Sequence, residues 1–179
     1  MPSVRLIWIQ KKSARKQADT LVCNLLMTAM FLKEYQEFSG RLSTIHSDKI
    51  SISAKKFVFE VLIRIGFKVL LDGYSRFKRL SNEAIGQLML DVKSIQIGLE
   101  GLCAQAGCPM KPLPMSSALS EFIRALYCKE EELEAFIQSS QELDSKYLVS
   151  IVNIVTANTL NKKLKQKLLS IAEEKNKLK

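Results

Sequence analysis

Residues 56–76 read KFVFEVLIRIGFKVLLDGYSR, and this stretch decides the fold of the chain. Its charged residues recur at every fourth position: Lys56, Glu60, Arg64, Lys68, Asp72 and Arg76. Because this spacing keeps side chains on one side of an α-helix, the pattern predicts a helix with a single polar stripe. A bilayer would not accept these charges, since a central Lys, Arg or Asp costs about 2.5–3.5 kcal/mol. We therefore predict the central helix of a protein core, with only the polar stripe in contact with water.

Helical patterns continue on both sides of this stretch. Before it, apolar residues recur every three or four positions from about Ser13 to Arg41, and residues 42–52 form a polar connection. After it, Ser81-Asn82-Glu83 is typical of a helix start, and one apolar face extends to about residue 104. We expect this helix and the 56–76 helix to form an antiparallel pair.

The second half of the chain begins with a proline cluster in residues 107–114, which excludes a helix there. We interpret the cluster as a connection within one domain. A short helix is expected to follow it, with Ser116 or Ser117 as its cap. The acidic run at residues 130–134 is expected to start another helix, because carboxylates stabilise the first turn.

Residues 147–155 are ambiguous, because their many β-branched residues fit a strand as well as a helix. We expect a helix, since the chain offers no second strand for pairing. The last expected helix extends from Asn161 to about Lys175. The whole chain has only 7 glycines and 4 prolines to make turns, so its composition favours an all-α fold.

Most of the net charge of +9 lies at the two ends of the chain. Residues 1–17 hold five basic side chains and no acid, and residues 161–179 hold seven basic and two acidic ones. Residues 18–160 hold 15 basic and 16 acidic side chains, so the body of the protein is neutral. We expect no nucleic-acid binding, because the body lacks a basic stripe with interleaved aromatics.

An alternative role follows from the basic C-terminal end. Its lysines surround Leu164 and Leu168 and could form a basic amphipathic helix on an anionic bilayer, as a weak peripheral membrane contact. The candidate residues for binding an anionic surface are Lys162, Lys163, Lys165 and Lys167.

The residue inventory favours a protein without catalysis. His46 is the only histidine and lies in a polar run, where a surface loop residue is expected. No phosphate-binding glycine motif occurs, and the four cysteines form no C-x-x-C pair. We interpret the cysteines as reduced thiols, with Cys103 and Cys128 in the core. We thus expect no catalytic residue, metal site, cofactor or small-molecule substrate.

Four segments of the chain resemble the C-terminal domain of the syndetin family: FLKEYQEFSGRL (31–42), LLDGYSRFKRLSNEAIGQLMLD (70–91), FIRALYCKEEELEAFI (122–137) and YLVSIVNIVTANTLNKKLKQKLL (147–169). The most specific piece runs from Asp72 to Asp91 and is similar to the family pattern GYANVKKCSNEGRALMQLD. The resemblance implies one elongated antiparallel bundle of about six to seven helices over residues 30–175, of the helical-rod type found in tethering complexes. Residues 1–29 match poorly and are expected to be partly helical or disordered, and residues 176–179 form a basic tail.

The syndetin family is the distinguishing subunit of the endosome-associated recycling protein complex, a vesicle tether. The resemblance therefore implies a non-catalytic protein-interaction domain that acts in endocytic recycling from endosome to plasma membrane and in retrograde vesicle traffic. It implies other tether subunits and SNARE proteins as partners. It also implies a cytoplasmic location, peripheral on recycling endosomes and the trans-Golgi network. The candidate partner-binding residues are charged residues of the most specific piece: Arg76, Lys78, Arg79 and Glu83.

Overall fold

A computed structural model describes residues 29–30, 32–42, 44, 50–158 and 161–175 of the chain. These residues contain no β-strand, so the all-α prediction is confirmed for them, whereas His46 lies outside the described ranges. The described residues between positions 29 and 44 are helical, and we call them the N-terminal helical segment. The elements that follow are α2 (Ile52–Tyr74), α3 (Asn82–Gln105), α4 (Ser116–Ala125), α5 (Leu133–Ser139), α6 (Ser145–Val155), the 3-10 helix η1 (Thr156–Asn158) and α7 (Lys162–Glu174).

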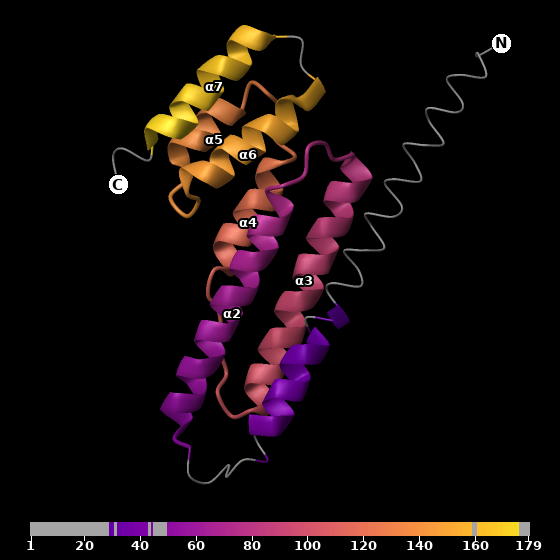
Figure 1. The fold of residues 1–179 in the computed structure, drawn as a ribbon, viewed down its shortest axis with the longest axis vertical. Helices are drawn as coiled ribbons and strands as arrows, with labels where there is room; N and C mark the ends of the chain where they lie inside the picture. Colours follow the sequence, from indigo (N-terminus) through magenta and orange to yellow (C-terminus); the bar gives the residue numbers. More distant parts are fainter. Residues whose placement is uncertain (1–28, 31, 43, 45–49, 159–160, 176–179) are drawn as a thin grey trace, which may run out of the picture.

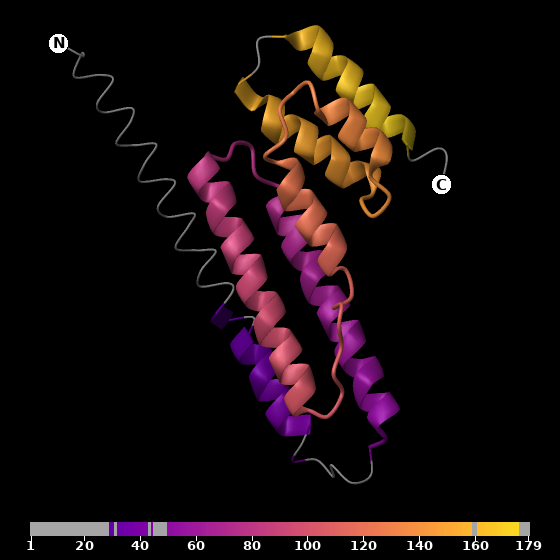
Figure 2. The ribbon, with the colours of Figure 1, turned by 180° about the vertical axis from the view of Figure 1, so that it is seen from behind.

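The helices form an elongated body with two groups (Figure 1). α2 and α3 run antiparallel, as predicted, and α4 lies in contact with both. The N-terminal helical segment lies at one end of this group, where the rings of Tyr35 and Phe59 are 5.5 Å apart between centroids. α5, α6 and α7 cover the other end, as the opposite view in Figure 2 also shows. Because α4 also contacts α6, it joins the two groups.

Three helices begin at a residue whose side chain caps the first turn. Ser51, Ser81 and Asn161 each accept a hydrogen bond from the backbone N–H three positions later, at 3.2, 3.2 and 3.1 Å. These bonds satisfy donors that the first helical turn leaves without an internal partner. The predicted starts at Ser81 and Asn161 are therefore confirmed.

The cap predicted for α4 is wrong. Ser116 is already helical, and its hydroxyl donates to the carbonyl of Leu113 at 2.7 Å. The hydroxyl of Ser117 instead donates to the Glu142 carboxylate at 3.1 Å. The residue before α4 is Met115, which adopts a left-handed conformation with φ of 60°. The chain thus enters α4 through a tight turn, which replaces a side-chain cap.

Residues 147–155 are helical, as expected from the lack of a strand partner. Tyr147, Leu148, Ile151 and Val152 are all at most 2% exposed. α6 contacts α4 and α7, and these contacts bury its apolar side chains. Packing therefore outweighs the preference of β-branched residues for strands.

The proline-rich connection between α3 and α4 contributes to the core. Its residues Cys108, Met110 and Leu113 are 2%, 7% and 3% exposed. They belong to the same core cluster as the fully buried Phe67 and Phe122. The connection therefore packs against the helices instead of looping out into solvent.

The prediction that only the polar stripe of α2 contacts water is wrong. Phe59, Ile63 and Phe67 are buried, but Phe57 and Ile65 on another side of α2 are 67% and 55% exposed. α2 lies at the edge of the bundle, so the other described helices cover only part of its apolar surface. The pattern could not reveal this, because it shows which residues are apolar and not how many neighbours cover them.

A charged cluster ties the C-terminal end of α2 to α6. The carboxylate of Asp72 accepts hydrogen bonds from Nζ of Lys146 and from the hydroxyl of Tyr147, both at 2.8 Å. These two bonds, that of Lys146 first, lower the pKa of Asp72 below its ordinary value. The folded state therefore favours the ionised carboxylate.

We expect the Asp72 cluster to make stability depend on pH. Since the folded pKa is lowered, its contribution is complete above the ordinary carboxyl pKa and is lost as the pH falls through the folded value. The wild type should exceed Asp72→Asn in free energy of unfolding by about 1 kcal/mol near neutral pH, because the cluster is partly solvated. Urea titrations from about pH 6 to about pH 2 should show this difference disappearing. A constant difference over this range would contradict the prediction.

Candidate binding surfaces

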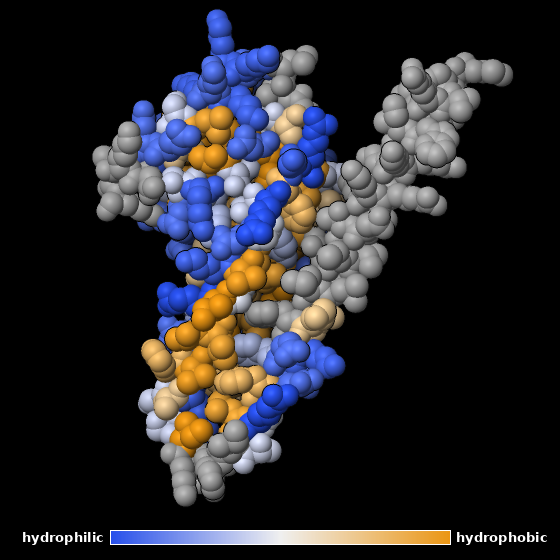
Figure 3. All heavy atoms as spheres, viewed as in Figure 1, coloured by the Kyte–Doolittle hydropathy of each residue, from blue (hydrophilic) through white to orange (hydrophobic). Residues whose placement is uncertain are grey.

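An exposed apolar row, which we call the α2 stripe, consists of Phe57, Val61, Ile65 and Val69. Their exposed fractions are 67%, 37%, 55% and 58%. Four-residue spacing places them along one side of α2. Figure 3 shows an apolar band over α2 on the face seen in Figure 1. The α2 stripe is therefore a continuous apolar surface without a covering helix among the described residues.

Charges of both signs border the α2 stripe. Lys56, Glu60, Arg64 and Lys68 each precede a stripe residue by one position, and Glu60 and Arg64 form an ion pair at 3.1 Å. Single exposed apolar residues are common on proteins and need no explanation. A row at helical spacing with charges beside it is instead typical of a helix face that packs on another helix.

The predicted partner-binding residues lie on the α2–α3 connection and the first turn of α3. Arg76, Lys78, Arg79 and Glu83 are all exposed. The guanidinium of Arg79 donates to the carbonyl of Ala157 in η1 at 3.3 Å. This bond joins the α2–α3 connection to the chain just before α7.

Glu83 has a local role at the start of α3. Its carboxylate interacts with the hydroxyl of Ser81 and with its own backbone N–H, and these interactions lower its pKa. A negative charge in the first turn also suits the helix dipole. Glu83 therefore stabilises the first turn of α3, and this role is independent of any partner binding.

The predicted lysines of α7 have different surroundings. Nζ of Lys167 forms an ion pair with the Glu134 carboxylate of α5 at 2.7 Å, whereas Lys162 and Lys163 are exposed. Leu168 is fully buried and belongs to the core. Because the apolar face of α7 is turned into the bundle, Leu168 is not available to enter a bilayer in this fold.

The fold brings Lys165 together with two of the predicted partner-binding residues. A hollow of ≈ 440 Å³, which we call the basic hollow, lies where the α2–α3 connection meets α6, η1 and α7. Figures 1 and 2 both show the α2–α3 connection close to the C-terminal end of α6. Its lining residues are Ser75, Phe77, Lys78, Arg79, Ser150, Asn153, Ala157 and Lys165. The other predicted residues do not line it.

Sequence reasoning missed the contribution of α6 to this hollow. Ser150 and Asn153 line it and are three positions apart in the otherwise apolar run 147–155. Residues three apart share one side of a helix, so these two polar positions were the available signal. Nothing in the sequence indicated that this side of α6 would face Lys78 and Lys165.

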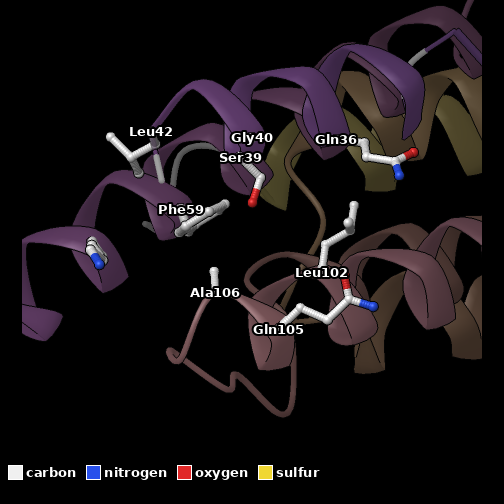
Figure 4. Close-up of a pocket in the computed structure, with 9 residues that line it drawn as sticks. Gln36, Ser39, Gly40, Leu42, Phe59, Leu102, Gln105 and Ala106 are labelled. Atoms are coloured by element: carbon white, nitrogen blue, oxygen red, sulfur yellow. The ribbon is translucent and has the colours of Figure 1, made fainter. Parts of the chain in front are cut away.

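A second, smaller pocket lies between the N-terminal helical segment, α2 and the end of α3 (Figure 4). Its volume is ≈ 260 Å³. Phe59 and Leu102 supply apolar walls, while Gln36 and Gln105 stand at its edge. Ligand sites of proteins usually exceed about 300 Å³. We therefore regard this pocket as a gap in helix packing.

The cysteines and carboxylates form no recognisable chemical site in the described residues. Cys103 and Cys108 are buried free thiols, and Cys128 is only half-buried. Burial raises the pKa of Cys103 to about 11, so it is a thiol and not a reactive thiolate at neutral pH. No group of three or more potential metal ligands gathers in the described part of the chain. Within the same ranges, every helix is too short or too polar to cross a bilayer.

Comparison with known proteins gives one consistent result. Residues 27–173 match a family model described as "Syndetin, C-terminal". The chain is 29% identical to the syndetin of Gallus gallus over 144 residues and to that of Mus musculus over 152 residues. These alignments cover 80% and 84% of this chain, but the chain spans only 15% of the length of each relative. No solved structure matches.

Proposed function

This chain belongs to the syndetin C-terminal family, and from that membership we propose that it is a non-catalytic protein-interaction domain of a vesicle-tethering complex subunit. The proposed setting is endocytic recycling from endosome to plasma membrane, together with retrograde vesicle traffic. The proposed partners are other subunits of the endosome-associated recycling tether and SNARE proteins. The proposed location is cytoplasmic, peripheral on recycling endosomes and the trans-Golgi network.

The α2 stripe is the observation that supports an interaction role. Ile65 and Val69 are more than half exposed, although the opposite side of the same helix is buried at Ile63 and Phe67. An exposed apolar row costs solubility and hydrophobic free energy unless a partner covers it. We infer that the occupant is an amphipathic helix of another tether subunit, laid along α2.

The charges beside the α2 stripe would set the register of that helix. Lys56 and Lys68 favour acidic positions on the partner, while Glu60 favours a basic one. We propose that four charged residues at the other end of α2 from Lys56 add specificity at the edge of this interface. They are Arg76, Lys78, Arg79 and Glu83. Rim charges influence the rate of association more than the final affinity.

We expect charged substitutions in the α2 stripe to weaken subunit capture strongly. The test co-expresses the tagged chain with the other subunits of the recycling tether and measures their co-purification. Val61→Asp/Ile65→Asp should reduce capture by about tenfold or more, because two charges would be buried against an apolar partner. Circular dichroism should show an unchanged helical content.

Leu90→Asp/Ile97→Asp is the matched control, since these α3 residues are 63% and 62% exposed. This variant introduces the same charges on a different helix and should capture normally. If both double variants captured the subunits as well as the wild type, the α2 stripe would not be the interface. If neither they nor the wild type captured any subunit, the interaction role itself would be refuted.

The alternative of a basic amphipathic helix on an anionic bilayer receives less support from the structure. Lys162 and Lys163 are exposed, but Lys167 is paired with Glu134 and Leu168 is buried. A membrane contact of α7 would therefore depend on the lysines alone. Such contacts are weak and are screened by salt.

A further inference from the structure

We propose that the basic hollow binds the phosphate groups of a phosphorylated inositol ring. Lys78 and Arg79 come from the α2–α3 connection, Lys165 from α7, and Asn153 from α6. The volume of ≈ 440 Å³ lies within the usual range for small-ligand sites. This site lies apart from the α2 stripe and shares only Lys78 and Arg79 with the charges assigned to partner specificity above, and phosphate binding does not require the protein-interaction role.

The hollow carries a local excess of positive charge. None of its lining residues is acidic. Among the described residues, no carboxylate forms an ion pair with Lys78, Arg79 or Lys165. The body of the chain, residues 18–160, is nearly neutral, with 15 basic and 16 acidic side chains. Lys78 and Arg79 belong to this neutral body and Lys165 to the basic C-terminal segment, and three cations without an ion-pair partner in the described part of the chain, around one concavity, create a positive field that attracts a multivalent anion.

Arg79 is oriented for binding a phosphate group. One of its N–H groups donates to the carbonyl of Ala157 at 3.3 Å, which holds the guanidinium across the gap between the α2–α3 connection and η1. Its other N–H groups remain for a ligand. A guanidinium can bind two phosphate oxygens at once, whereas Lys78 and Lys165 act as point charges on either side.

The neutral lining residues fit the rest of an inositol ring. The hydroxyls of Ser75 and Ser150 donate to backbone carbonyls at 2.8 and 2.9 Å, so their oxygens are left to accept hydrogen bonds from ring hydroxyls. The exposed amide of Asn153 can both donate and accept. Phe77 stacks on Tyr74 with centroids 6.2 Å apart and offers an apolar wall for the ring C–H groups. This mixture suits a phosphorylated polyol better than inorganic phosphate alone.

The first test is calorimetric titration of the whole chain with soluble inositol trisphosphate. The wild type should bind, and Lys78→Ala/Lys165→Ala should bind about tenfold more weakly or worse. Lys93→Ala/Lys129→Ala is the matched control, because it removes the same charge from exposed lysines outside the hollow and outside α7. Its affinity should remain within about twofold of the wild type.

A second variant keeps the test independent of folding defects. Asn153→Asp adds one carboxylate to the hollow at an exposed position, and charge repulsion should weaken trisphosphate binding by about tenfold. Thermal melting of every variant would show whether the fold is intact. Absence of trisphosphate binding by the wild type would overturn the proposal. Equal loss of binding in the two double-lysine variants would also overturn the proposal, because it would show that the net charge of the protein alone attracts the trisphosphate.

Flotation with vesicles distinguishes the two sources of this ligand. One set of vesicles carries phosphatidylinositol bisphosphate, and the other carries phosphatidylserine at equal surface charge. Flotation with the first set only, abolished by soluble trisphosphate, would support the hollow as a site for a lipid headgroup. Trisphosphate binding without flotation would support it as a site for a soluble inositol phosphate. Equal flotation with both sets, unaffected by trisphosphate, would contradict a specific site.

Discussion

Replacing Phe122 with alanine is expected to lower the free energy of unfolding by about 3–5 kcal/mol. The Phe122 side chain is fully buried in α4, and its ring meets that of Tyr147 in α6 edge-on, with centroids 6.5 Å apart. α4 contacts α2 and α3 as well as α6, so a cavity at Phe122 opens where the two helix groups meet. Urea unfolding followed by circular dichroism should show a lower midpoint at an unchanged slope.

Phe57→Ala is the matched control for this prediction. It removes the same aromatic side chain from α2, where Phe57 is 67% exposed. Its effect on the free energy of unfolding should remain within about 0.5 kcal/mol, as for other surface substitutions. Equal losses from Phe57→Ala and Phe122→Ala would mean that the α2 stripe is covered in solution, for example by a second copy of the chain.

Replacing Leu168 with alanine is expected to cost about 2–5 kcal/mol, with the largest effect on the group formed by α5, α6 and α7. Leu168 is fully buried and is one of two buried residues of α7, the other being Ala172. α7 contacts both α5 and α6, and Leu168 is its largest fully buried side chain, so truncating it removes apolar packing from this group of helices. Hydrogen exchange should show faster exchange in α7 and α5 than in the wild type.

The pattern of hydrogen exchange along the chain tests whether the Leu168→Ala variant opens locally or as a whole. The free energy of local opening depends on contacts near the amide. Amides in the middle of α2 and α3 should therefore retain most of their protection against hydrogen exchange. Leu90→Ala is the control, because it makes the same substitution at a residue of α3 that is 63% exposed. Uniform loss of protection in the Leu168→Ala variant would show that the two helix groups unfold as one cooperative unit.

The candidate surfaces could be predicted only in part. Lys78, Arg79 and Lys165 were all predicted as binding residues, but they were assigned to two separate surfaces. Lys165 follows Arg79 by more than eighty positions, and no local pattern links residues at such a distance. The α2 stripe was misjudged for a related reason, since Ile65 and Phe67 are equally apolar in sequence although one is 55% exposed and the other fully buried.

The sequence by itself determined that the chain is helical, roughly where its main helices begin and end, and to which family it belongs. These properties depend on side-chain spacing, capping residues and family patterns, which are local or linear features of the chain. Tertiary structure alone decided which apolar side of α2 is covered and which basic residues meet. It also decided that Leu168 is buried and that Ser116 does not cap α4. Each of these depends on the neighbours that packing supplies, and packing is a property of the whole fold.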